Sequence, residues 1–213
     1  MQSIKLKTAI LFSVGLAACS LFDQRENDPA AFNQWTKSVS HTPTVAILPF
    51  ANKTNQVDLP KLVRVGFCGH FSPLPFNDRE LDEVDKNLTL IEKEQKKSFD
   101  ELSSQELGSF LGAEILIYGE VTDYTKIYAG VYSQIGVGAK IKMVDAQSSQ
   151  TIWEDAYNTR FHEGNIPMNQ FLAVFSLLKT GANIRSVQEL RTIDDLCRNL
   201  VARIPKVSLS EEK

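Results

Sequence analysis

The chain has 213 residues, with 23 Lys and Arg against 26 Asp and Glu, a formal net charge of −3, and 43% hydrophobic residues. Without an excess of basic residues, we expect no nucleic-acid partner. The length allows one sizeable domain or two small ones.

Residues 1–18 have the pattern of a secretion signal. Two lysines precede an apolar run over residues 9–18, which is shorter than a membrane span of about 20 residues and fits the core of a signal peptide. The run ends in Leu16-Ala17-Ala18-Cys19, which resembles the lipobox of bacterial lipoproteins. The resemblance implies cleavage before Cys19 and acylation of its sulfur and its new amine. The alternative is an ordinary cleavage site at which Cys19 is incidental.

A lipid on Cys19 would hold the mature protein on a membrane without a spanning segment. Each buried methylene contributes about 0.8 kcal/mol, so several acyl chains anchor a domain almost permanently. Ser20 follows the cysteine, and in the better-known bacterial lipoproteins a residue other than Asp there resembles an outer-membrane sorting signal. We therefore predict a lipid-anchored outer-membrane protein whose domain faces the periplasm.

The segment after the anchor is polar and lacks sustained periodicity. We predict a flexible tether over residues 19–43, a periplasmic domain over 44–205 and a polar tail over 206–213. Phe32 and Trp35 interrupt the tether, and we expect them to dock on the domain surface or on a partner.

The domain opens with a strand and a helix. A continuous apolar run predicts a buried strand at 44–50, followed by a polar loop at 51–58. Helical spacing predicts a helix at 59–71 with Pro60 in its first turn. A short extended piece follows at 72–76.

Two more helices are predicted before the central strands. The first covers residues 77–88, with Asn77 or Asp78 as N-cap, and a charged, solvated surface follows at 91–102. The second begins with a capping box formed by Ser103 and Glu106. Its inward-facing residues are expected to be Leu107, Phe110 and Leu111, and Gly112 ends it.

Three antiparallel strands form the centre of the sequence, over 113–128, 131–144 and 151–161. The middle strand alternates between apolar and polar residues, so one face is expected to be buried and the other wet. Its apolar positions are Val131, Ile135, Val137, Ala139, Ile141 and Met143. Gly136 and Gly138 have the opposite parity, where glycines mark the close approach of another backbone. Either an interface with another element or subunit, or a covering loop, would explain them.

Two helices are predicted in the last part of the chain. The helix at 168–180 carries more apolar residues than one buried stripe requires, so we expect either a central core helix or a surface that assembles the protein into rings. Ser186 and Glu189 indicate another capping box. The final helix has a single apolar stripe formed by Val187, Leu190, Ile193, Cys197, Leu200, Val201 and Ile204.

No catalytic or metal-binding constellation is evident. His70 lies near Cys68, and His162 lies beside Glu163, but neither pair has the ligand number or spacing of a zinc site. We expect no metal, no cofactor and no enzymatic activity. Cys68 and Cys197 are either a disulfide across the domain or two buried thiols. A cluster of tyrosines, Tyr124, Tyr128 and Tyr132, would pack across strands or contact a partner or lipid headgroups.

This order of elements predicts an α+β fold: a mixed sheet with an antiparallel three-strand meander and helices packed on it. The stretches VAILPFANKT, LGAEILIYGEVTDY and GAKIKMVDAQSSQTIWE resemble envelope lipoproteins with a fold like the amino-terminal domain of TolB, a group that includes the curli secretion lipoprotein CsgG. The stretch HFSPLPFNDRELDEVDKNL resembles a subgroup related to the meningococcal vaccine-candidate lipoprotein family. In the turn before TIWE, Gln150 stands where relatives commonly have glycine.

The resemblance implies a non-enzymatic role. The first hypothesis is a scaffold or accessory factor that joins an envelope protein complex for export, secretion or assembly of a surface organelle, with a homo-oligomeric ring as its form. The second is a regulator that binds one envelope enzyme, such as a cell-wall synthase. The third is a hydrolase or redox protein that uses Cys68 or His162.

Overall fold

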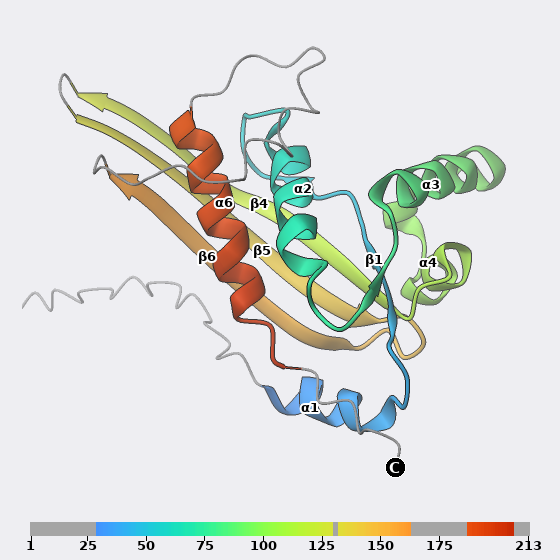
Figure 1. Cartoon of the computed structure of the whole chain (residues 1–213). Coiled ribbons are helices and arrows are strands. Elements are labelled where there is room, and N and C mark those ends of the chain that lie inside the picture. Colours follow the sequence, from blue (N-terminus) through green and yellow to red (C-terminus); the bar gives the residue numbers. More distant parts are fainter. Residues whose placement is uncertain (1–28, 130–131, 163–186, 207–213) are drawn as a thin grey trace, which may run out of the picture.

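The chain folds around a mixed β-sheet (Figure 1). The computed structural model describes residues 29–129, 132–162 and 187–206. The strand order is β3-β1-β4-β5-β6, and β2 pairs with β4 beside this path. The strands are β1 (Thr44–Ile47), β2 (Ala51–Asn52), β3 (Asn77–Asp78), β4 (Ile115–Ala129), β5 (Tyr132–Asp145) and β6 (Thr151–His162). β1 runs parallel to β3 and β4, whereas β4, β5 and β6 form an antiparallel meander. The predicted fold class is confirmed.

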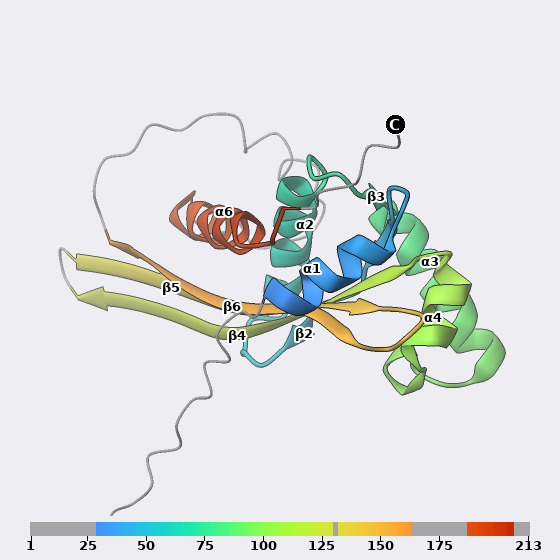
Figure 2. The ribbon, with the colours of Figure 1, turned by 90° about the horizontal axis from the view of Figure 1, so that it is seen from below.

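Helices cover both faces of the parallel part of this sheet. They are α1 (Pro29–Ser38), α2 (Leu59–Phe71), α3 (Leu81–Gln95), the 3₁₀ turn η1 (Phe99–Glu101), α4 (Ser104–Leu111) and α6 (Val187–Ala202). Figure 2 shows α2 and α6 together on one side of the strands. Among the described residues, no helix is long and apolar enough to cross a membrane.

Strand β1 is buried on both faces. Its side chains alternate between the two cores because successive residues of a strand point to opposite faces. Val45 and Ile47 join the core beneath α2 and α6, whereas Ala46 joins the core beneath α3 and α4. All three are 0% exposed. A short parallel strand covered on both sides reads as an unbroken apolar run, as the sequence predicts.

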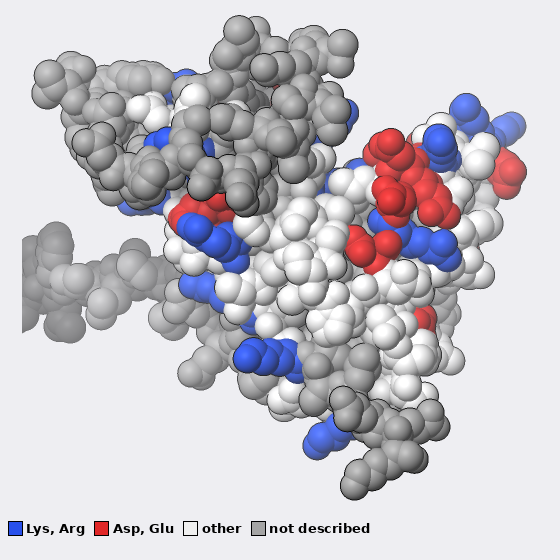
Figure 3. All heavy atoms as spheres, in the orientation of Figure 1, with Lys and Arg blue, Asp and Glu red and all other residues white. Residues whose placement is uncertain are grey.

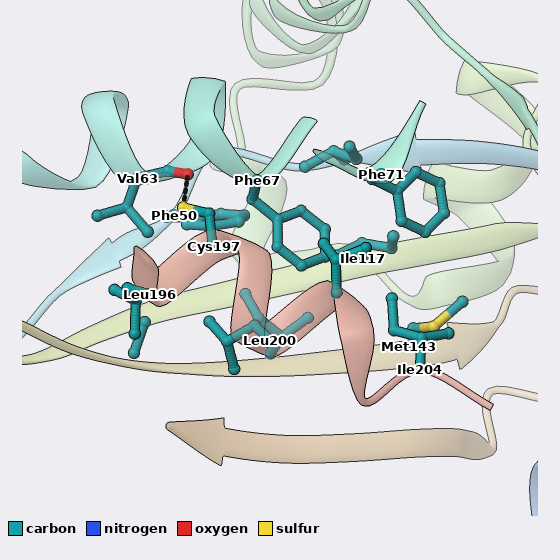
Figure 4. Packing of buried hydrophobic residues seen from close by; sticks show 14 of the residues in the cluster. Phe50, Val63, Phe67, Phe71, Ile117, Met143, Leu196, Cys197, Leu200 and Ile204 are labelled. Atoms are coloured by element: carbon teal, nitrogen blue, oxygen red, sulfur yellow. Dashed lines mark hydrogen bonds between the residues drawn. The ribbon is translucent and has the colours of Figure 1, made fainter. Parts of the chain in front are cut away.

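The larger core lies between the sheet and the pair α2 and α6 (Figure 4). Phe67 of α2, Leu200 of α6 and Ile117 of β4 meet there with no exposed surface. In β5, the described positions of the predicted apolar parity line the same core. The period-two prediction for this strand is therefore confirmed for Ile135, Val137, Ala139, Ile141 and Met143.

Helix α1 lies within the segment that the sequence predicts to be a flexible tether. Phe32 is 0% exposed and belongs to the larger core, and the indole Nε1 of Trp35 donates a hydrogen bond to Asp145 Oδ2 at 2.9 Å. Residues 29–38 are therefore part of the folded domain rather than of a tether, and the expected docking of Phe32 and Trp35 on the domain is confirmed. Residues 19–28 lie outside the described part, so a tether there stays a prediction.

Two short strands replace predicted loop and helix residues. Ala51 and Asn52 pair with β4 although the sequence predicts a polar loop at 51–58. Asn77 and Asp78 pair with β1 instead of capping a helix. Main-chain hydrogen bonds to the open edge of β1 outweigh the capping preference of these side chains, and α3 therefore starts only at Leu81.

Helix α3 is longer than predicted because Ile91 extends its buried stripe of Val84 and Leu88 by one more turn. It ends at Gln95, so the charged surface predicted at 91–102 begins inside a helix. Its carboxyl end is capped by Lys96 in the left-handed conformation, with φ of 56°.

The capping box of α4 is confirmed: Ser103 accepts from the Glu106 amide while the Glu106 side chain accepts from the Ser103 amide. Gly112 ends the helix with φ of 58°. Phe110, however, is 45% exposed. The buried residues of α4 are Leu107, Gly108 and Leu111, and a Cβ on Gly108 would lie 2.4 Å from Ala146 Cβ. Phe110 lies about 200° around the helix from Gly108, outside this face.

Most of the predicted apolar stripe of the last helix is confirmed, since Ile193, Cys197, Leu200, Val201 and Ile204 are buried. At the start of α6 the prediction is wrong for Val187, which is exposed, and the buried positions there include Glu189 and Thr192. The Glu189 carboxylate, 4% exposed, accepts a hydrogen bond from the Tyr124 hydroxyl and lies 3.3 Å from Lys126 Nζ. These contacts join α6 to the protruding part of β4. Ser186, the partner of Glu189 in the predicted capping box, and the predicted helix 168–180 lie outside the described residues.

Phe32→Ala should destabilise the protein by about 3 kcal/mol, because it removes a fully buried ring and leaves a cavity under α1. Urea unfolding measures the loss, and hydrogen exchange should show faster exchange in α1. Gln34→Ala on the exposed side of the same helix serves as control. Equal stability of the two variants would contradict the docking of α1.

Candidate partner-binding groove

A crevice lies at the carboxyl ends of the neighbouring parallel strands β1 and β3, because the helices that follow them pack on opposite faces of the sheet. From β1 the chain passes to α2 on one face, and from β3 it passes to α3 on the other. In open sheets with parallel strands, ligands bind outside the carboxyl ends of strands at such a switch point. A groove of about 640 Å³ lies at this place, between α2 and α3. We take it as the candidate functional site.

The lining of the groove combines apolar side chains, most of them buried or half-buried, with charged ones. The carboxyl end of β1 contributes Pro49 and Phe50, α2 contributes Pro60, and α3 contributes Leu81 and Leu88. Val57, in the loop before α2, stands at the margin with 86% of its surface exposed.

Arg64 lies at the floor of the groove and is only 6% exposed. Its Nε and Nη2 atoms donate hydrogen bonds to the Ile47 carbonyl at 3.2 and 2.7 Å, and Nη1 donates to Asp85 Oδ1 at 2.7 Å. The guanidinium therefore joins the end of β1 to α3 across the crevice. A buried charge needs such partners, so Arg64 is a positioning residue that fixes the distance between the two walls.

The accessible charges on the α3 wall are acidic. Asp82, Asp85 and Glu92 are exposed and face the groove, opposite Lys61 on α2. In Figure 3, acidic side chains gather over α3 beside an uncharged surface. Asp82 lies in the first turn of α3, where a carboxylate stabilises the helix dipole. Glu92 lies in the last turn, where it opposes the dipole, so helix stability does not account for it.

A second hollow, of about 670 Å³, lies beside the end of α1. Its ionisable side chains already bind one another or the main chain. His41 Nε2 lies 2.8 Å from Glu114 Oε1, and Glu114 Oε2 accepts from the Thr44 amide. Asp145 accepts hydrogen bonds from Ser148 and Trp35, which lower the pKa of its carboxyl despite the opposing effect of burial. These contacts hold α1 and the strand ends together.

The candidate disulfide is not formed, because both cysteines are free. Cys197 Sγ lies against Gly66 of α2, and its thiol donates to the Val63 carbonyl at 3.4 Å (Figure 4). Cys68 is two residues beyond Gly66, about 200° around the helix, so its side chain is on the other side of α2. Burial raises the pKa of both thiols, which disfavours the thiolate that a nucleophile needs.

The histidines do not complete a catalytic site with Cys68. His70 Nε2 lies 2.7 Å from Asp194 Oδ1 and joins α2 to α6. The side chain of His162 and the whole of Cys19 lie outside the described residues. Within the described ranges, no group of three or more His, Cys, Asp or Glu residues could hold a metal ion.

Side chains of neighbouring strands lie over Gly138 of β5, and the predicted interface with another subunit stays a prediction. Asn158 Nδ2 donates to Asp123 Oδ2 at 3.3 Å, and a Cβ on the glycine would lie 3.0 Å from Thr122 Oγ1. Of the three tyrosines, Tyr124 packs against the core, as the cross-strand packing hypothesis expects. The side chains of Tyr128 and Tyr132 are not among those described.

The comparisons with known proteins define a class of envelope lipoprotein. Residues 82–203 match the model of the GNA1162-like lipoproteins, so the chain belongs to this family, and the predicted resemblance is confirmed. Among curated proteins, none matches the chain in sequence.

Solved structures are similar to this chain at low sequence identity. Lipoprotein GNA1162 from Neisseria meningitidis superposes with a TM-score of 0.51 at 16% identity, over 64% of this chain and 92% of that one. A PelC dodecamer from Paraburkholderia phytofirmans gives 0.47 at 11%, over 77% and 89%. The LpoB carboxyl-terminal domain from Escherichia coli gives 0.37 at 10%, over 62% and 96%. The likeness to GNA1162 shows a shared fold.

The two thiols should differ in reactivity. In the native protein, iodoacetamide should alkylate Cys68 slowly and leave Cys197 intact, because Cys197 is 0% exposed. In denaturant, both should react. Mass spectrometry under non-reducing conditions measures the labels, and a mass two hydrogens short of the dithiol form would contradict the structure.

Replacing Arg64 should lower the free energy of unfolding more than replacing its partner Asp85. Arg64→Ala should cost about 3 kcal/mol, since it removes three hydrogen bonds and the buried stem. Asp85→Ala should cost about 1 kcal/mol because water can reach the freed guanidinium atom from the half-exposed Asp85 site. Urea unfolding measures both, and Glu94→Ala on the same helix should change stability by less than about 0.5 kcal/mol.

Proposed function

We propose that this chain is an outer-membrane-anchored lipoprotein whose periplasmic domain is a non-enzymatic accessory factor or scaffold. It serves in the assembly of an envelope machine for export, secretion or a surface organelle. Membership of the GNA1162-like lipoprotein family supports the anchored part of this proposal. The groove between α2 and α3 supports the functional part, since it is a hollow with an apolar and acidic lining at a switch point of the sheet.

In this proposal the chain consists of an amino-terminal targeting and anchoring segment and a folded domain that binds partners. Residues 1–18 are removed as a signal peptide, and Cys19 becomes the lipidated amino terminus. A short tether runs from Cys19 to α1, and the domain extends from α1 to Pro205. Residues 206–213 are a polar tail. The domain presents its groove to proteins that share the same membrane.

Two related roles would use the same surface. A regulator that binds one envelope enzyme would yield a single partner in equal proportion, whereas a scaffold would yield several components of one machine. Homo-oligomer formation through the helix predicted at 168–180 would make the scaffold a ring, and light scattering on the soluble domain would measure its size.

A photoreactive amino acid at position 57 should crosslink the protein to envelope proteins in living cells, because this position lies exposed at the groove margin. The crosslinked products should be identified by mass spectrometry as components of one assembly or as one enzyme. Cys19→Ser should abolish labelling with palmitate and reduce these crosslinks, because the unanchored domain diffuses away from the membrane.

The same photoreactive residue at position 94, on α3 but outside the groove, is the matched control. It should give few of the products obtained from position 57. Equal products from both positions, or none from position 57 in a correctly lipidated protein, would contradict the proposed role of the groove. Equal palmitate labelling of the wild type and Cys19→Ser would contradict the anchor.

A further inference from the structure

We infer that the groove binds an extended segment of the partner protein in which an apolar side chain is flanked by Lys or Arg. The inference rests on the proposed function, because it names the chemistry of the partner that the groove receives. Three properties of the groove lead to it: its apolar lining, the sign of its accessible charge, and the exposure of its polar groups.

The apolar part of the groove is large enough to receive at least one aliphatic or aromatic side chain. The hollow of about 640 Å³ lies within the range of ligand sites. Leu88 and Phe50 line it and are almost fully buried in the domain, whereas Val57 is 86% exposed at the margin. A partner side chain inserted here would remove Val57 from water, and burial of such apolar surface favours association.

The accessible charge favours a cationic partner. Arg64 is buried, and its donors are already directed to the Ile47 carbonyl and to Asp85, so its charge is not offered to a ligand. Because Arg64 and Asp85 neutralise each other, the remaining accessible charges of the lining are the carboxylates of Asp82 and Glu92 and the ammonium of Lys61, an excess of one negative charge. Because Asp85 holds Arg64 through Oδ1 and its side chain is 52% exposed, the carboxylate can also receive a cation from solvent.

The state of the polar groups favours a chain segment over a small molecule. Specific small-molecule sites enclose most of the surface of their ligand. Polar side chains that line the groove, including those of Lys61, Asp82 and Glu92, are instead exposed to water. A peptide segment needs no such enclosure, since its main chain can remain hydrated while its side chains enter the hollow.

The test uses residues 19–213 with Cys19→Ser, labelled with ¹⁵N, and three short synthetic peptides of equal length as probes. The first has a central Lys-Leu-Lys, the second Glu-Leu-Glu and the third Lys-Ala-Lys. The first should shift the amide resonances of groove residues on α2 and α3, and its affinity should fall with added salt. The second should produce no such shifts, and the third should bind at least fivefold more weakly.

Two variants on the last turn of α3 separate the groove from general charge effects. Glu92→Lys should weaken binding of the Lys-Leu-Lys peptide about fivefold, since it replaces attraction by repulsion. The variant should remain folded because a cation in the last turn suits the helix dipole. Glu94→Lys makes the same charge change outside the groove and should leave the affinity within about twofold, because exposed charges off the contact contribute little.

Several outcomes would overturn the inference: equal binding of the anionic peptide, shifts confined to another surface, no shifts with any peptide, or equal affinities of the two variants. Binding of small apolar molecules in the groove, without any peptide, would assign it to a ligand of another class. If crosslinks from position 57 persist in cells while the charge preference fails, the proposed function stands and this inference does not.

Discussion

The structure depends on one strand, β1, which is covered on both faces and bonded on both edges. Its side chains divide between two cores, with Val45 and Ile47 in one and Ala46 in the other. Because both faces must be covered, the helices that follow β1 and its neighbour β3 have to lie on opposite sides of the sheet. The divergence of α2 and α3 opens the groove, so the binding surface is a geometric consequence of the way in which the core is closed.

The elements predicted well from the sequence are those in which one local pattern and the tertiary structure agree. The alternation in β5 and the capping box at Ser103 are examples, because the contacts that specify them are short-range or strictly periodic. The failures have the opposite character. Asn77 and Asp78 are residues that commonly cap helices, yet their main chain pairs with the edge of β1 instead. Helix α1 has few apolar residues, and Phe32 and Trp35 stabilise it only through contacts with distant parts of the chain.

The candidate groove was not predictable as a site, although its residues are visible in the sequence. Arg64 lies between Val63 and Phe67 on the buried side of a predicted helix, and a lone charge among apolar residues was the available signal. Its meaning depends on Asp85, 21 positions away, and on the end of β1. The acidic residues of α3 resemble an ordinary solvated face until the fold places α2 opposite them. Cys68 and Cys197 show the converse. The sequence allows them to pair, but both thiols are free, and Cys68 lies about 200° around α2 from Gly66, the residue that contacts Cys197.

The docking of α1 would limit how far the domain can move in the proposed lipid-anchored protein. Ten residue steps separate Cys19 from Pro29, and a fully extended chain of that length reaches only about 35 Å. A tether that extended to Thr44, as the sequence predicts, would let the domain move much further from the membrane. With the lipid that we propose on Cys19, the domain would instead be confined to a thin layer at the membrane. Membrane-bound partners would then be met at high effective concentration, so that even a weak contact in the groove would be occupied for much of the time.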